Sequence, residues 1–278
     1  MAFNDGASCE TSDNEAIDSA LTALHAHSFA RGLHTLESRW LHVLIAVLVL
    51  GVGTWAGIQF GIPALAHRAA FALPVETDAL LGSQALEALD RTVFEATTLP
   101  AARQRELQAL FADMAAEVRS GHTFRLELRS SEALGANAFA LPSGIVVLTD
   151  ELVALSADDR ELQAVLAHEL GHVVNRHSLR AVLQNSATSL LMIGVLGDVS
   201  TASALVAALP TLLVQLKHSR AFELEADDYA YAWLDEHGVA RHHFGALLLR
   251  LEQQAGEDRD AVANWLSSHP RTAERLRN

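Results

Sequence analysis

The hydrophobic positions divide the chain into a polar first segment, one long uncharged run and a longer stretch of mixed periodicity. Residues 1–42 are polar and acidic at first and contain too few apolar positions to fold alone. Residues 43–66 carry no charged side chain, and as a helix they would measure about 36 Å, against roughly 30 Å for the hydrocarbon core of a bilayer. The pattern predicts an N-terminal polar arm, one transmembrane helix at 43–66 and a domain at 67–278.

A cleaved signal peptide is the alternative for the uncharged run, and the small residues 64–66 would suit a cleavage site. The long acidic arm before the run, and the length of the run itself, favour an anchor. Arg31 and Arg39 precede the run and Arg68 follows it closely. The positive-inside rule therefore predicts a cytoplasmic arm and an external C-terminal domain.

Glycines recur every fourth position in the uncharged run, at Gly53, Gly57 and Gly61. Such spacing allows two membrane helices to approach closely, so it indicates a surface for a homo-oligomer. Glycine is common in membrane helices, and a chance repeat explains the spacing equally well.

The domain that follows begins with helical patterns and continues with short strands. Two helical patterns occupy residues 76–120, with Pro100 between them. Residues 123–129 alternate apolar and charged side chains, as a half-buried strand does, and 139–141 and 145–148 supply two further strands. The fold class predicted is α+β, mainly helical, with a small sheet.

The apolar stretch 181–216 is interrupted by Gly197-Asp198 and by Pro210. Neither half is long enough to cross a bilayer comfortably. We expect a helical hairpin that shields the functional site or dips into the bilayer, and a true membrane hairpin is the alternative.

Net charge and cysteine content argue against a nucleic-acid-binding protein and against a disulfide-stabilised fold. The formal net charge is −14, whereas nucleic-acid binding requires a basic face. The single cysteine, Cys9, excludes an intrachain disulfide framework.

The sequence His168-Glu169-Leu170-Gly171-His172 lies in an apolar run of helical period. On a helix His168 and His172 share one face with Cβ atoms roughly 5–6 Å apart, so both imidazoles can bind one metal ion, and zinc suits nitrogen ligands. Glu169 lies beside them, where a carboxylate can take a proton from an attacking water. In a chain with 14 histidines this short pattern also arises by chance, so a third ligand is needed.

A second block, residues 219–227, supplies that ligand. On a helix Glu223 and Asp227 share one face, and Glu225 lies about 200° round from Glu223. We expect Glu223 to be the third ligand of one zinc ion per chain. Asp227 is then placed to accept a hydrogen bond from a ligating imidazole and fix its tautomer. Glu225 is expected to be a solvated carboxylate.

His177 is a rival third ligand. The pattern H-E-x-x-H-x-x-G-x-x-H would require glycine at 175 and histidine at 178, and the chain has Asn175 and Ser178. His177 also lies five residues after His172, off the ligand face. We interpret it as a histidine at a helix end, where positive charge is favoured by the helix dipole.

The blocks H-E-L-G-H-V-V-N-R-H and S-R-A-F-E-L-E-A-D resemble those of the membrane-associated zinc peptidases that include CaaX prenyl endopeptidases, HtpX-like heat-shock proteases and periplasmic quality-control peptidases. Residues 137–144 resemble that family's N-A-F-A-x-P-G-G strand, with Ser143 departing from the usual glycine. His269-Pro270 with Arg275 resembles its H-P-x-x-x-x-R block. The resemblance covers about residues 120–278.

The resemblance implies a gluzincin-type zinc peptidase domain in the bacterial inner membrane, acting on polypeptides such as misfolded or envelope proteins. It implies that His269 and Arg275 reach the active site and stabilise developing negative charge. The alternative is a helix N-terminus whose His and Arg only pair with carboxylates. HtpX-like relatives span the membrane at the apolar stretch 181–216.

In zinc peptidases of this kind an edge strand beside the metal pairs with extended substrate. The residues that would form it here are Asn137, Ala138, Phe139 and Ala140. A strand pair that only packs is the alternative.

Two other functions fit the same motifs. One is a zinc-bound membrane chaperone or scaffold whose site the hairpin keeps closed. The other, a structural zinc site, is disfavoured because three protein ligands leave an open position and Glu169 would then have no structural purpose.

Overall fold

The computed structural model describes residues 15, 16, 19, 40–196, 219–257 and 269. The chain divides into two units, Met1–Gln59 and Phe60–Asn278. Most of the predicted polar arm lies outside the described residues.

The uncharged run is helical throughout. Helix α3 (Trp40–Ala56), the π-helical turn η1 (Gly57–Gly61) and α4 (Ile62–Ala72) follow one another in the chain. Pro63 accounts for the π-helical turn, because its ring lacks an N–H and crowds the carbonyl four residues earlier. Among the described residues, Trp40–Ala72 is the one helix long and apolar enough to cross a membrane.

The helix continues beyond the predicted end at residue 66 because its last turns pack on protein. Ala66 and Ala70 of α4 are buried, and α4 lies against α9 (His177–Leu196). Helix α9 corresponds to the first half of the predicted hairpin 181–216. Residues 197–218, which would complete the hairpin, lie outside the described part of the chain.

A four-stranded sheet has the order β1-β2-β4-β3. Its strands are β1 (Glu95–Ala96), β2 (Arg125–Ser130), β3 (Ala138–Ala140) and β4 (Ile145–Thr149). Strand β4 pairs in parallel with β2 and antiparallel with β3. The three predicted strands are present, and β1 is too short for any alternation to reveal it. Strand β4 is central and buried, and β3 forms one edge.

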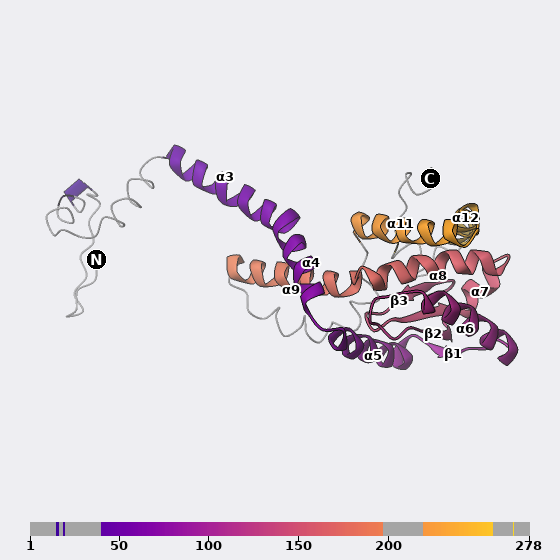
Figure 1. Ribbon diagram of the computed structural model, residues 1–278. Coiled ribbons are helices and arrows are strands. Elements are labelled where there is room, and N and C mark those ends of the chain that lie inside the picture. Colours follow the sequence, from indigo (N-terminus) through magenta and orange to yellow (C-terminus); the bar gives the residue numbers. More distant parts are fainter. Residues whose placement is uncertain (1–14, 17–18, 20–39, 197–218, 258–268, 270–278) are drawn as a thin grey trace. The chain divides into compact units, whose positions relative to one another are not determined.

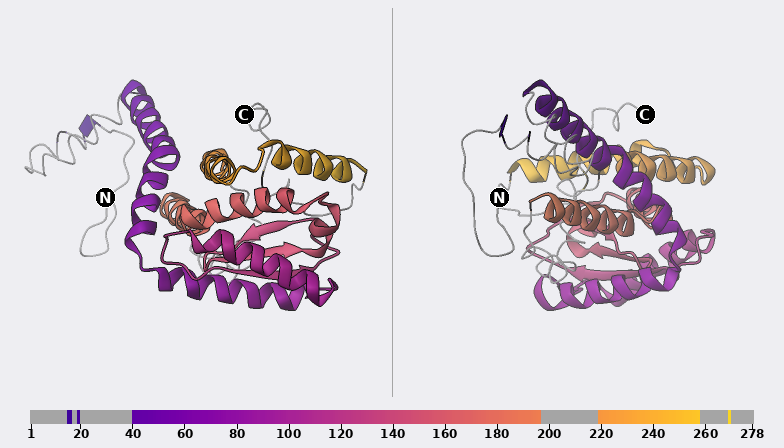
Figure 2. Two further views of the ribbon diagram at one scale, coloured as in Figure 1. Left: turned by 45° about the vertical axis from the view of Figure 1, so that its right-hand side comes forward. Right: turned by 90° about the vertical axis from the view of Figure 1, so that its left-hand side faces the viewer.

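Helices cover both faces of the sheet (Figures 1 and 2), and the side chains of β4 alternate between these two faces. Ile145 and Val147 pack with apolar residues of α5 (Val75–Thr92) on one face. Val146 and Leu148 pack on the other face with α6 (Ala101–Ala116) and α8 (Asp159–Val174). The fold is therefore α+β and mainly helical, as the sequence predicts.

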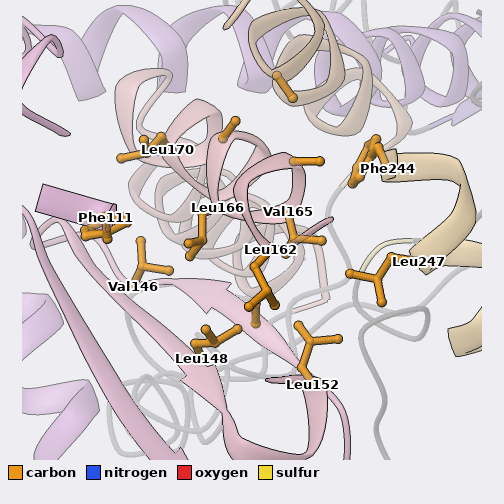
Figure 3. Packing of buried hydrophobic residues seen from close by; sticks show 14 of the residues in the cluster. Phe111, Val146, Leu148, Leu152, Leu162, Val165, Leu166, Leu170, Phe244 and Leu247 are labelled. Carbon is orange, nitrogen blue, oxygen red and sulfur yellow. The ribbon is translucent and has the colours of Figure 1, made fainter. Parts of the chain in front are cut away.

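Helix α8 follows the short α7 (Asp150–Leu155) and begins at Asp158, whose side chain accepts hydrogen bonds from the first backbone N–H groups. One stripe of the helix, Leu162, Leu166 and Leu170, is fully buried toward β4 (Figure 3). Burying each leucine contributes about 1.5–3 kcal/mol. This packing holds α8 on the sheet, so the side of α8 opposite the leucines faces away from the sheet.

Two further helices cover that opposite side of α8 (Figure 1). They are α11 (Arg220–Glu236), capped by Ser219, and α12 (His242–Glu257). Val165 of α8 lies on the side of Phe244 and Leu247 of α12 (Figure 3). Helix α8 is thus enclosed by the sheet on one side and by α11 and α12 on the other.

We predict that Gly82→Ala destabilises the domain, because α5 crosses the turn between β3 and β4 at this glycine. An added Cβ would lie 2.2 Å from Ser143 Oγ and 2.6 Å from Ser143 N. Overpacking of this kind costs about 1–3 kcal/mol. The matched control is Gly245→Ala in α12, where nothing lies within 4 Å and alanine is expected to stabilise the helix by about 0.5–1 kcal/mol. Urea unfolding would measure both, and an equal effect of the two changes would contradict the close contact.

Candidate metal centre

Four side chains from separate parts of the chain meet beside α8. His168 and His172 lie on α8, Glu223 lies in the first turn of α11, and His269 follows much later in the chain. Each offers one donor atom, and these atoms all lie within 4.8 Å of one another. All four residues are buried.

A close approach of α8 and α11 makes this meeting possible. Gly171 lies between the two histidines of the motif, and a Cβ at this position would be 3.0 Å from Cα and O of Ala226 on α11. Any larger side chain there would separate the helices. The helical period then directs the histidines, which lie opposite the leucine stripe, toward Glu223.

The ring nitrogens of the two motif histidines are arranged for a cation. Nε2 of His168 and Nε2 of His172 are 3.0 Å apart, and they lie 3.7 and 3.5 Å from the Glu223 carboxylate. Nδ1 of His168 lies 2.9 Å from Oδ1 of Asp227. A proton on that Nδ1 satisfies Asp227 and leaves Nε2 of His168 with a lone pair directed at the other donors. Two nitrogens and a carboxylate converging in a buried space suit zinc.

Asp227 is the partner of His168, and one helical turn separates it from Glu223. Asp227 is buried, so its contact with His168 is shielded from water. Glu169 is also buried, and its Oε1 lies 3.6 Å from Nε2 of His269. Glu169 therefore adjoins the donor group without being part of it.

His269 lies deeper in the donor group than sequence reasoning indicated. Its Nδ1 is 3.1 Å from both carboxylate oxygens of Glu223 and 3.3 Å from Nε2 of His168. This position suits either a donor to a reacting oxygen or a fourth donor to the metal. Arg275, its expected partner, lies outside the described residues.

The interpretation of His177 as a helix-end histidine was wrong. Helix α8 ends at Val174, and Arg176 has a left-handed φ of 51°, so His177 begins a new helix, α9, and is fully buried. Its Nδ1 lies 2.9 Å from Nδ1 of His172. Burial lowers the pKa of His177 below its ordinary value.

Glu225, expected to be a solvated carboxylate, is half-exposed but also has protein partners. Its Oε2 lies 3.0 Å from Nε2 of His177 and accepts a 2.6 Å hydrogen bond from Arg180. The hydrogen bond from His177, followed by that from Arg180, lowers the pKa of Glu225 to about 2. Glu225 does point away from Glu223, as the helical period predicts, but it meets side chains of α9 there.

The expected substrate strand corresponds to β3, which packs against α8. Asn137 precedes it, and its backbone N–H and C=O bond to Thr149 at the end of β4. Phe139 lies opposite Val147. By the alternation of an antiparallel pair, the backbone N–H and C=O groups of Ala138 and Ala140 point away from β4. On that outer edge the C=O of Ala140 accepts a 3.5 Å hydrogen bond from Ser178 Oγ.

Comparisons with known proteins agree with this geometry. Residues 101–278 match the family model described as Peptidase family M48. The mitochondrial metalloendopeptidase OMA1 of Arabidopsis thaliana is 31% identical over 134 residues, which are 48% of this chain and 27% of that protein. The metalloprotease LoiP of Escherichia coli (strain K12) is 28% identical over 152 residues, 52% of this chain and 58% of LoiP.

A third relative matches a shorter stretch. The beta-barrel assembly-enhancing protease of Escherichia coli (strain K12) is 41% identical over 69 residues, 24% of this chain and 14% of that protein. The chain therefore spans less than two thirds of the length of these curated relatives.

We predict that Glu223→Ala loses the zinc that the parent retains through dialysis, because the change removes the one carboxylate of the donor group. The matched control is Glu236→Ala, an exposed carboxylate at the end of the same helix, which should retain one zinc per chain. Metal analysis of the purified proteins would measure both. Undiminished zinc in Glu223→Ala would remove this residue from the donor group.

Proposed function

The chain belongs to peptidase family M48, and from that premise we propose that it is a membrane-anchored zinc metalloendopeptidase. One observation carries the proposal above all. His168, His172 and Glu223 bring two imidazoles and a carboxylate together in a buried space, and the carboxylate of Glu169 adjoins them without joining them. A site built only to hold metal has no use for that additional carboxylate.

In this proposal His168, His172 and Glu223 hold one zinc ion per chain. Bound zinc would supply a Lewis acid that polarises the scissile carbonyl and makes an attacking water more acidic. Asp227 keeps the proton of His168 on Nδ1, so Nε2 stays available as a donor.

Glu169 is the proposed general base. It takes a proton from the attacking water as the water oxygen bonds to the carbonyl carbon, and the charge moves to the carbonyl oxygen. It then passes the proton to the nitrogen of the leaving amine as the C–N bond breaks and the carbonyl re-forms. Its burial excludes bulk water, which strengthens its interaction with the reacting groups.

His269 and Arg275 are the proposed donors to the negative charge that develops on the carbonyl oxygen. The position of His269 beside Glu169 and Glu223 supports its part in this assignment. Donors fixed where charge develops contribute roughly 3–4 kcal/mol to catalysis.

Extended substrate is proposed to pair with the outer edge of β3, where it would replace the 3.5 Å hydrogen bond from Ser178 Oγ to Ala140 O. The outward backbone groups of Ala138 and Ala140 would bond to substrate backbone, while Asn137 and Phe139 tie the strand to β4. Backbone pairing binds many sequences alike, which suits misfolded or envelope polypeptides as substrates.

The helix Trp40–Ala72 is the proposed anchor. A single span leaves the peptidase domain wholly on one side, and the arginines beside the run favour the external, periplasmic side of a bacterial inner membrane. Pairing through the glycines of this helix is the proposed route to a homo-oligomer.

A closed, inactive zinc site is the second candidate, in a membrane chaperone or scaffold. The observation that favours it is the place of His269 within the donor group, since a fourth donor would close a tetrahedral site. Hydrolysis of a peptide bond distinguishes the two functions.

We predict that Glu169→Gln retains zinc and loses hydrolysis, because the amide cannot accept the proton of water. Loss of a general base lowers kcat about 10²–10⁴-fold. Casein cleavage and metal content, measured on the same preparation, would test this, with exposed Glu236→Gln as the control. Full activity of Glu169→Gln would refute the mechanism.

We predict that full-length protein stays in the membrane fraction through alkaline carbonate extraction. Cys9, the single cysteine, lies in the arm before the span. Labelling of this thiol therefore shows on which side of the membrane the arm lies. A membrane-impermeant maleimide added to spheroplasts should label Cys9 only after lysis. Release by carbonate would refute the anchor. Labelling of Cys9 in intact spheroplasts would show that the arm is external and the peptidase domain cytoplasmic.

A further inference from the structure

Behind His172, on the side opposite the other metal donors, a row of side chains leads outward to a half-exposed carboxylate. Nδ1 of His172 lies 2.9 Å from Nδ1 of His177. Nε2 of His177 lies 3.0 Å from Oε2 of Glu225. Arg180 donates to the same carboxylate through both terminal nitrogens, at 2.6 and 3.3 Å.

These contacts determine where the protons lie. An ionised carboxylate only accepts hydrogen bonds, so Nε2 of His177 must donate to Glu225. A neutral imidazole has one N–H, which leaves Nδ1 of His177 with a lone pair. The short contact between the two Nδ1 atoms needs one proton, and only His172 can provide it. His172 therefore carries its proton on Nδ1, and the lone pair of its Nε2 points into the space that Nε2 of His168 and the Glu223 carboxylate also face, where a cation would bind.

We propose that His177 is a positioning residue, which fixes the tautomer and ring orientation of His172 for metal binding and is itself oriented by Glu225. This inference rests on the proposed zinc site. His177 would then orient His172 as Asp227 orients His168.

The surroundings of His177 hold its ring in one orientation. The ring is fully buried and stacks on Phe222, with centroids 4.4 Å apart and planes 6° apart. The guanidinium of Arg180 also packs on Phe222, 4.4 Å from its centroid. The first turn of α9 is thereby fixed to the first turn of α11, which carries Glu223.

The break between α8 and α9 is what gives His177 this role. Arg176 adopts a left-handed conformation that a non-glycine residue adopts only when its surroundings hold it. Its guanidinium donates to the carbonyl oxygen of Leu73 and pairs with buried Asp78 at 2.7 Å. These contacts stabilise the turn that directs His177 back toward His172.

The test compares three variants of the full chain by zinc affinity, measured through competition with a chromophoric chelator. His177→Phe keeps an aromatic ring against Phe222 but removes both nitrogens. His177→Asn places an amide oxygen near the position of Nδ1 and can still accept the proton of His172. Glu225→Ala removes the outer carboxylate, which is half-exposed, and also takes a partner from buried Arg180, so its melting temperature must be compared with that of the parent.

We expect His177→Phe to weaken zinc binding about 10–100-fold, the usual cost of losing the orienting partner of a ligand histidine. His177→Asn should restore most of the affinity, and Glu225→Ala should weaken it by a smaller factor than His177→Phe. Exposed Glu236→Ala is the matched control and should bind zinc as the parent does. Melting temperatures of the metal-free proteins separate loss of affinity from loss of packing.

Zinc affinity equal to the parent in Glu225→Ala and in a folded His177→Phe would overturn the inference. So would an equal loss of affinity in His177→Asn and His177→Phe, because the ring would then act through packing and not through its nitrogen. If the parent itself bound no zinc, the proposed function would fail first. A parent that binds zinc while its variants bind equally well rejects the positioning role alone.

Discussion

The short distance between α8 and α11 is the constraint on which the rest of the structure depends. Two imidazoles and a carboxylate lie buried within reach of one another, and burying polar groups is costly unless each has a partner. Gly171 permits the approach, since α11 backbone occupies the space of its missing side chain. The leucine stripe of α8 fixes the helix on the sheet from the other side, so the histidines cannot turn away.

Much of this centre follows from helical period alone, and the sequence predicts it for that reason. His168 and His172 are four residues apart, as are Glu223 and Asp227, and each pair shares one helix face wherever the helix lies. The resemblance to zinc peptidases then assigns both pairs to one metal site. The strands of the sheet are equally visible, because alternation of apolar and polar residues marks a half-buried strand.

Features that depend on contacts between elements could not be predicted. Alternation identifies β2 and β4 as strands, yet nothing in it indicates that they pair in parallel. The role of His177 depends on a single backbone conformation, the left-handed Arg176, which ends one helix and starts another. Sequence reasoning placed His177 at the end of the motif helix and Glu225 in solvent, because it did not predict that a second helix begins at residue 177. Asparagine is a poor helix former that favours helix ends, so Asn175 was the available signal for the break, although the left-handed residue is Arg176.

The central claim is that these buried groups form a working zinc peptidase and not a closed metal site. It is tested most directly by incubating the purified full-length protein with casein, before and after zinc is removed by a chelator and after zinc is returned. The account predicts cleavage that stops on removal and resumes with zinc but not with magnesium, since magnesium prefers oxygen ligands. Intact casein in the presence of protein that carries one zinc per chain, or cleavage that continues after the metal is removed, would contradict it.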